Sequence, residues 1–237
     1  MIYLPKKEAD IMNEAQWQGA MEKRHSVRSY LTKPIEPDAL TALTASIKQY
    51  NQASGLRIQL VTNEPKAFSG PMAHYGHFSG VRNYIALAAP EIENRETVAG
   101  YYGEKLVLEA QTLGLSTCWV ALTYSKRKCP IIINPGDKLI CVIAIGYGIS
   151  PGRAHKSRPA EELSNLSDAS PDWFRRGVEA ALLAPTAVNQ QSFYLAQEGD
   201  SVALSSKGGP YSKIDLGIVK LHFELGAGKE NFVWKEV

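Results

Sequence analysis

The sequence lacks a long hydrophobic run and an excess of charge of either sign. Its longest unbroken apolar stretch covers residues 139–145, whereas a membrane-spanning helix needs about 20 residues. Lys and Arg total 26 against 24 Asp and Glu, which leaves a formal net charge of +2 at pH 7. A dedicated nucleic-acid binder usually carries a clustered basic face instead. We therefore expect neither a membrane nor a nucleic acid as a partner.

Cysteine is also scarce. Cys118, Cys129 and Cys141 form an odd set without a close pair. This spacing favours reduced thiols over a disulfide framework or a zinc site. Charged side chains begin at Lys6, which leaves no room for the apolar core of a signal peptide. We expect a cytoplasmic protein that binds no metal.

The remaining composition is that of a globular protein. The chain has 237 residues, of which 44% are hydrophobic and 21% charged, so it can bury a sizeable core. At roughly 150 residues per domain, it would form one large domain or two small ones. The low hydrophobicity and high net charge of a disordered chain are both absent.

Apolar periodicity predicts both helices and strands. Asp38 is the expected N-cap of one helix, and Gly114 is the expected C-cap of a helix that begins near residue 97. Residues 66–80 predict an irregular loop, and the apolar strand 139–147 belongs in the middle of the sheet. The other expected helices are residues 14–22, 171–183 and 215–225, and the other expected strands are residues 56–60, 81–89, 115–120, 193–196, 202–204 and 232–234.

The amino-acid composition of the chain changes after Gly148. Residues 155–170 are polar and rich in turn formers, which indicates a boundary or a crossing segment. We expect a first lobe over residues 1–160 and a smaller second lobe over residues 161–237. The order helix, loop, strand, strand, helix, strand recurs in the second lobe, although few residues match. The pattern is compatible with an internal duplication without demonstrating one.

The pentapeptide at residues 24–28 combines two arginines with a hydroxyl group. Arg24 and Arg28 are four positions apart, and Ser26 lies between them. Planar guanidinium groups can bind phosphate oxygens bidentately, and a hydroxyl adds a further hydrogen bond. A phosphate site is one interpretation, and a solvated basic turn is the other.

A second basic run contains Lys156 and Arg158 and is preceded by Gly152 and Arg153. By itself such a run is usually a surface feature. Together, the two basic runs would place four cationic groups around one anion, which favours a shared phosphate site.

The stretch 184–193 offers neutral hydrogen-bonding groups on a loop that Pro185 stiffens. Thr186, Asn189 and Gln191 supply donors and acceptors. An asparagine amide matches the alternating N–H and C=O edge of a heterocycle such as a flavin pyrimidine. The alternative is a helix-ending turn whose amides are satisfied internally.

Taken together, these motifs resemble those of the nitroreductase family of flavin oxidoreductases. Arg24-His-Ser-Val-Arg28 resembles the family's Arg-Arg/His-Ser-x-Arg start. Gly114-Leu-Ser-Thr-Cys-Trp119 resembles its Gly-Leu-Gly-Thr-x-Trp stretch, and Pro185-Thr-Ala-Val-Asn189-Gln-Gln191 its Pro-Ser-x-x-Asn-x-Gln loop. The resemblance implies an α+β, nitroreductase-like fold with a central, mostly antiparallel sheet flanked by helices and with an internal duplication.

The resemblance also implies an FMN site with three groups of residues. The phosphate and the ribityl chain would be held by Arg24, His25, Ser26, Arg28, Lys156 and Arg158. The loop that approaches the flavin ring would contribute Pro185, Thr186, Asn189 and Gln191. The other side of the ring would be covered by the backbone of Trp119, Val120, Ala121 and Leu122. Hydride would pass from NADH or NADPH through FMN to a small nitro, quinone or enone acceptor, and no side chain would be catalytic.

Two departures from the family pattern affect the expected assembly and donor. Ordinary members have the Asn loop soon after the Arg motif, whereas here it lies at residues 185–189 and residues 50–55 occupy the early position. Ordinary members are homodimers that build each site from both subunits. A chain of two fused half-repeats, as in one branch of the family, would complete its site as a single-chain pseudo-dimer, and a homodimer is the alternative. The pair Ala121-Leu122 replaces an acidic residue and glycine, which leaves the choice of donor open.

We therefore expect an FMN-dependent, nitroreductase-like NAD(P)H oxidoreductase that acts on a small molecule. The rival interpretation is a non-catalytic flavin-binding or flavin-storage protein of the same fold. A structural module without a cofactor is a third class.

Overall fold

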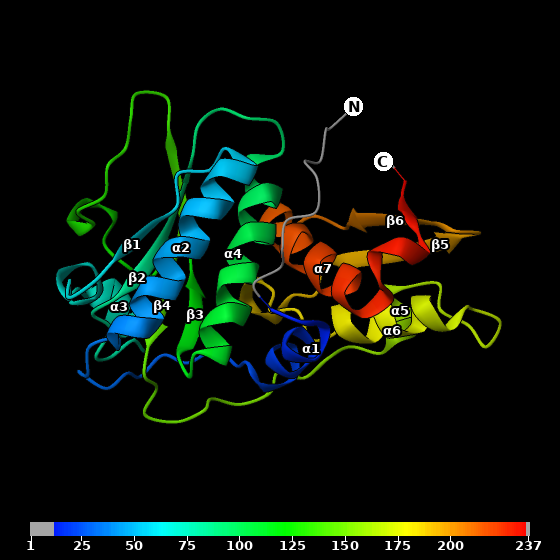
Figure 1. Cartoon of the computed structure of the whole chain (residues 1–237), viewed down its shortest axis with the longest axis horizontal. Coiled ribbons are helices and arrows are strands. Elements are labelled where there is room, and N and C mark those ends of the chain that lie inside the picture. The colour runs from blue at the N-terminus through cyan, green and yellow to red at the C-terminus, as the bar shows by residue number, and fades with distance from the viewer. Residues whose placement is uncertain (1–11, 236–237) are drawn as a thin grey trace.

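The computed structural model describes residues 12–235, so the charged positions from Lys6 to Asp10 lie outside the described residues. The first lobe is built on a four-stranded antiparallel sheet. In order across the sheet, its strands are β1 (Gln59–Val61), β2 (Tyr84–Ala89), β4 (Lys138–Gly146) and β3 (Ser116–Val120). One face is covered by helices α2 (Pro37–Ser54) and α4 (Arg95–Thr112), as Figure 1 shows. The other face packs against the 3-10 helix η1 (Lys66–Phe68) and the short helix α3 (Pro71–Tyr75).

The central strands are buried on both faces. Along β2, Ile85 and Leu87 pack on the side of α2 and α4, whereas Tyr84 and Ala86 pack on the side of η1 and α3. This alternation follows from the two-residue period of a strand. Strand β4 lies between β2 and β3, which confirms the expected central position of residues 139–147.

The second lobe contains a smaller sheet. Strand β5 (Phe193–Glu198) pairs antiparallel with β6 (Ser201–Ser206), and β6 pairs parallel with β7 (Val233–Trp234). Helices α6 (Asp172–Ala181) and α7 (Ser212–Ala227) pack against each other, and α7 also contacts the sheet. The remaining helical elements are α1 (Glu14–Lys23), α5 (Ala160–Leu163) and the 3-10 helices η2 (Lys126–Lys128), η3 (Ala187–Asn189) and η4 (Lys229–Asn231).

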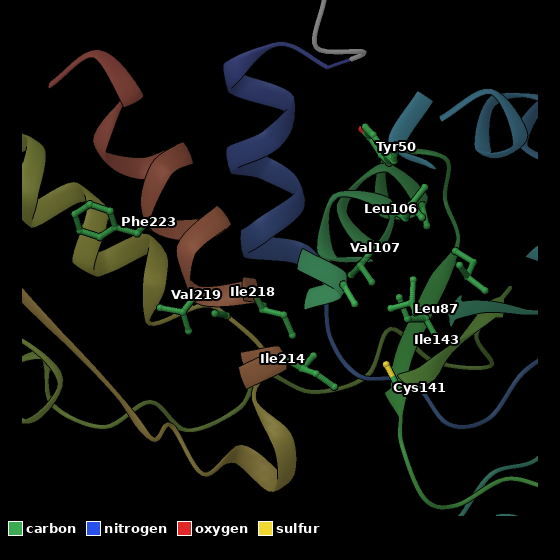
Figure 2. Packing of buried hydrophobic residues seen from close by; sticks show 14 of the residues in the cluster. Tyr50, Leu87, Leu106, Val107, Cys141, Ile143, Ile214, Ile218, Val219 and Phe223 are labelled. Atoms are coloured by element: carbon green, nitrogen blue, oxygen red, sulfur yellow. The ribbon is translucent and has the colours of Figure 1, made fainter. Parts of the chain in front are cut away.

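Helices α4 and α7 join the two lobes at a close crossing. A Cβ atom on Gly217 would collide with the carbonyl oxygen of Thr97, and one on Gly100 would collide with that of Ile214. The absence of a side chain at both glycines therefore permits this approach. Figure 2 shows apolar side chains of α7, α4 and the central strands, which belong to one continuous buried cluster.

Most of the expected elements are confirmed, with four corrections. Leu113 rather than Gly114 is the C-cap of α4, because the helix ends at Thr112, and Gly114 follows the cap with a left-handed φ of 73°. Glu36 rather than Asp38 occupies the N-cap of α2, because Pro37 begins the helix at a position where its missing N–H is not needed. Residues 66–80 contain η1 and α3 and are not entirely irregular. The strand expected at residues 56–60 shifts toward its C-terminal end and becomes β1.

The architecture confirms the α+β class with a mostly antiparallel sheet. Apart from the 3-10 helices and the short helix α3 between β1 and β2, the order helix, strand, strand, helix, strand occurs in both lobes, beginning with α2 and with α6. The strand pairings differ, since β3, the counterpart of β7 in this order, pairs antiparallel with β4, whereas β7 pairs parallel with β6. The internal duplication and the lobe bounds 1–160 and 161–237 therefore stay predictions. Within residues 12–235, no helix combines the length and the apolar character that crossing a membrane requires.

Candidate functional site

An extended segment carries the arginine motif along the edge of the first sheet. Helix α1 ends at Arg24, whose backbone is extended. The N–H of Val27 donates to the carbonyl oxygen of Thr117 on β3, at 2.9 Å. Side chains alternate along an extended backbone, so Val27 is buried in the core while Ser26 and Arg28 line a hollow at the surface.

The first part of this hollow, the basic cavity, has a volume of about 560 Å³. Its described lining residues include three arginines and two histidines and no carboxylate. Arg24 is 5% exposed, and its Nε atom is buried without a hydrogen-bond partner among the described residues. The three guanidinium groups around the cavity can pair with the oxygens of an anion. The lining residues are Arg24, His25, Ser26, Arg28, Gly152, Arg153, His155, Pro185, Thr186, Val188 and Asn189.

One of the two histidines adds no positive charge at pH 7. Burial and the neighbouring Arg24 guanidinium lower the pKa of His25, so its ring is neutral at pH 7. The Nε2 atom of His155 lies 2.9 Å from the carbonyl oxygen of Leu182, which favours a proton on that nitrogen. The guanidinium groups of the basic cavity have the charge and geometry to bind an anion.

Two residues of the predicted phosphate site lie outside this lining. Arg158 forms an ion pair with Glu162 at 2.7 Å, and Lys156 lines neither part of the hollow. Arg153 and His155 face the basic cavity in their place. The sequence analysis could not separate these neighbours, because an irregular segment has no periodicity that orients its side chains. Gly152 turns this segment toward the arginine motif with a φ of +79°.

The hollow continues into an apolar cavity of about 450 Å³. The two cavities share Ser26, Arg28, Pro185, Thr186 and Val188, so they form one continuous space. The end of β3 and the following loop provide the predicted residues Trp119, Val120, Ala121 and Leu122. The start of α7 adds Tyr211, Ile214, Asp215 and Ile218, which the sequence analysis missed because apolar periodicity in a helix predicts only a core face.

The loop at residues 186–191 bends through left-handed backbone. Val188, Asn189 and Gln191 have φ angles of 47°, 56° and 45°, where residues other than glycine are uncommon. The amide of Asn189 donates to the carbonyl oxygen of Lys156 at 3.0 Å and accepts from Gln191 at 3.1 Å. Asn189 therefore lines the basic cavity, and not the apolar one, while Gln191 is buried beneath the loop and lines neither.

Trp119 is held in the wall of the apolar cavity by a buried polar network. Its indole N–H donates to Glu104 Oε2 at 2.8 Å. The other oxygen of Glu104 lies 3.0 Å from His222 Nε2, and His222 Nδ1 lies 3.1 Å from the carbonyl oxygen of Ala180. Glu104 and His222 are both fully buried. The network links α4, α7 and α6 to the cavity and fixes the orientation of the indole.

The chemistry of the hollow fits the three parts of FMN. The dianionic phosphate would meet the arginines of the basic cavity. Hydroxyl groups of Ser26 and Thr186 lie in the shared wall, where the polyol chain would pass. The planar ring would occupy the apolar cavity beside Trp119.

Known families and structures resemble the chain over most of its length. A family model described as "Putative TM nitroreductase" matches residues 17–227. A structure described as a putative nitroreductase from Thermotoga maritima is 22% identical, with a TM-score of 0.64, over 97% of this chain and 90% of that chain. No curated protein matches.

Two further structures resemble one part of the chain and show the fold alone. A putative nitroreductase from Desulfovibrio desulfuricans, solved in complex with FMN, is 18% identical over 65% of this chain and 98% of that chain, with a TM-score of 0.50. A nitroreductase-like protein from Streptococcus mutans is 12% identical over 66% of this chain and 100% of that chain, with a TM-score of 0.51. With the family model covering nearly the whole described chain, the protein belongs to the nitroreductase family.

Proposed function

We propose that the protein is an FMN-dependent oxidoreductase that oxidises NADH or NADPH and reduces a small organic acceptor. The observation that carries this proposal is a basic cavity that is lined by three arginines, has no carboxylate among its described lining residues and opens into an apolar cavity. A phosphate on a planar aromatic cofactor matches both halves of the hollow. Bound FMN supplies the transfer of hydride between a nicotinamide donor and the acceptor.

In this proposal, the residues of the chain bind the cofactor and orient it. Arg24, Arg28 and Arg153 pair with the phosphate, and their position on both sides of the basic cavity fixes its place. Trp119, held by Glu104, forms a rigid wall that excludes water from one side of the apolar cavity. No side chain is assigned a nucleophilic role.

The rim of the hollow favours a flat, hydrophobic acceptor. Tyr75, Leu122 and Val188 line the apolar cavity, yet they are 79%, 64% and 96% exposed. Large apolar side chains that remain this exposed around a cavity are typical of a ligand-binding mouth. Nitroaromatic compounds, quinones and enones have the matching shape and polarity.

One complete site per chain is part of the proposal. In the first lobe, Asn51 lies in the segment that corresponds to the Asn loop, but its side chain bonds to the backbone N–H and C=O of Ile58. Arg158, at the end of the first lobe, is paired with Glu162. Neither position is free to build a second site of the same kind.

The proposal is tested by reversing one charge of the basic cavity. Arg28→Glu should abolish retention of FMN and leave the fold intact, because the new carboxylate repels the phosphate. Arg176→Glu, which changes an exposed arginine on α6, is the matched control and should bind FMN like the unmodified protein. The unmodified protein should also prefer FMN to riboflavin, since riboflavin has no phosphate. Equal affinity for the two flavins in a titration would contradict the proposed site.

Turnover is tested separately by anaerobic mixing with NADH or NADPH. Bleaching of the yellow cofactor, followed by its return when a quinone or a nitroaromatic is added, is expected of an oxidoreductase. A yellow protein that neither donor bleaches would instead be a flavin-binding or flavin-storage protein.

A further inference from the structure

The loop at residues 186–191 depends on contacts outside itself. Its left-handed residues are Val188, Asn189 and Gln191, and side chains other than glycine hold this conformation only where the surroundings compensate. One anchor is the Gln191 amide, which donates to the carbonyl oxygen of Lys156 at 3.0 Å and accepts from the N–H of Arg158 at 2.8 Å. This anchor fixes the end of the loop that leads into β5.

The second anchor is Asp215, in the first turn of α7. It is 5% exposed, and its oxygens accept the backbone N–H of Ala187 at 3.0 and 3.2 Å. Its Oδ2 atom also accepts from the side-chain amide of Gln190 at 2.7 Å. Ala187 and Gln190 lie on either side of the left-handed residues Val188 and Asn189. One carboxylate therefore holds the loop at both ends of this bend.

Stabilisation of the helix alone does not explain this arrangement. An acidic side chain in the first turn of a helix interacts favourably with the helix dipole while exposed to solvent. Asp215 is buried instead, and burial raises its pKa to about 6, against the opposing hydrogen bonds from Gln190 and Ala187. At pH 7 the ionised form is therefore kept in an unfavourable environment, where its hydrogen bonds connect α7 to the loop.

We infer that Asp215 is a positioning residue for the cofactor, whose carboxylate holds the loop so that Pro185 and Thr186 form the wall shared by the two cavities. The inference rests on the proposed FMN site. Asp215 acts through Ala187 and Gln190. A loop that is already held in its binding conformation need not be ordered when FMN binds, which increases affinity.

The test compares Asp215→Asn with Asp200→Asn, which changes an exposed aspartate in the turn between β5 and β6. Asparagine keeps the size of the side chain, but it replaces one acceptor oxygen with an N–H group that faces the donors of the loop. The Kd for FMN should rise on the order of tenfold or more, which matches the loss of one hydrogen bond to a charged group. Asp200→Asn should bind FMN like the unmodified protein.

Stability of the apoprotein separates positioning from a general structural role. Asp215→Asn also removes a buried charge, so the thermal midpoint of the apoprotein at pH 7 should not fall. The visible circular dichroism of the bound flavin should change, because the wall of the apolar cavity moves. A purely structural role would lower the midpoint in parallel with the loss of FMN.

A second variant tests the same link without a change in charge. Gln190→Ala removes the side chain that donates to Asp215 and to the carbonyl oxygen of Pro210. It should also weaken FMN binding. The double variant should lose less affinity than the sum of the two single losses, because both substitutions disrupt one contact.

The outcomes distinguish this inference from the proposed function. A protein that binds no FMN before any substitution would make both wrong. Normal FMN binding together with unchanged affinity in Asp215→Asn would overturn the inference alone. A thermal midpoint of the Asp215→Asn apoprotein that falls in parallel with its FMN affinity would also overturn the inference. So would a double variant whose loss of FMN affinity equals the sum of the two single losses.

Discussion

At the scale of single residues, two buried charges determine the chemistry of the hollow. Among the residues that the structure describes, the buried Nε donor of Arg24 has no partner, and Asp215 holds a carboxylate where burial disfavours its ionised form. Groups of this kind lower the stability of the protein unless a ligand or oriented dipoles compensate, which is why they gather at functional sites. Both line the same continuous hollow.

The raised pKa of Asp215 predicts how pH changes the stability of the apoprotein. The folded protein holds this proton up to about pH 6, whereas the unfolded chain releases it near 3.8. The folded state therefore binds more protons between these values, and the contribution of Asp215 to the free energy of unfolding falls as pH rises through this window. At about 1.4 kcal/mol per pKa unit, the full loss is roughly 3 kcal/mol.

Urea unfolding of the apoprotein at several pH values measures this effect. Other groups titrate in the same window, so the quantity to follow is the difference between the unmodified protein and Asp215→Asn. The unmodified protein should lose stability relative to the variant between about pH 4 and about pH 6, and the difference should then level off. Parallel pH profiles for the two proteins would show that Asp215 is not the titrating group.

At the scale of elements, the crossing of α4 and α7 positions the site. Ile214, Asp215 and Ile218 reach the apolar cavity because α7 approaches α4 closely at Gly217. The same pair of helices carries the buried contact between Glu104 and His222. Any change that separates the helices would move both the α7 wall and the support of the indole.

Gly217→Ala tests the importance of this crossing. The added Cβ would meet the backbone of Thr97, which cannot rotate away as a side chain would. Overpacking of this kind costs about 1–3 kcal/mol, so the thermal midpoint and the FMN content should both fall. Gly19→Ala on α1 is the matched control, because its Cβ would meet no described residue within 4 Å. That control should stabilise the protein by about 0.5–1 kcal/mol through helix propensity alone.

At the scale of the whole molecule, both lobes of one chain line a single hollow. Residues 24–28 come from the first lobe and residues 185–189 from the second, and they meet in the basic cavity. The side chain of Asn189 is bonded to the backbone of Lys156 in the same chain. This geometry supports a site that needs no second subunit.

Mixing two inactive variants tests whether the site is shared between chains. Arg28→Glu and Asn189→Ala should each lose FMN, and a mixture of the two should remain inactive if each chain builds its own site. A saturated preparation of the unmodified protein should carry about one FMN per chain by absorbance. Restored activity in the mixture would require exchange of halves between subunits and would rule out the single-chain site.

The sequence predicts an element or a motif correctly where the pattern lies within a few neighbouring residues. The continuous apolar run of β4, the periodic helices and the arginine motif at residues 24–28 follow from patterns of a few neighbouring residues, and the structure has the corresponding elements. Asp38 was misplaced as a cap because a proline one position earlier overrides its preference. Lys156 and Arg158 could not be ranked against Arg153, since the direction of a side chain in an irregular segment depends on what packs around it.

By itself, the sequence determined the family and the α+β class, because residue types and their order carry that information. Only the tertiary structure decided which cations line the basic cavity, that Asn189 bonds to the backbone of Lys156 and that Asp215 bonds to the loop at Ala187. These outcomes depend on contacts between residues far apart in the chain. Burial, unpaired donors and collisions arise only when α4 and α7 pack and bring the two lobes around one hollow.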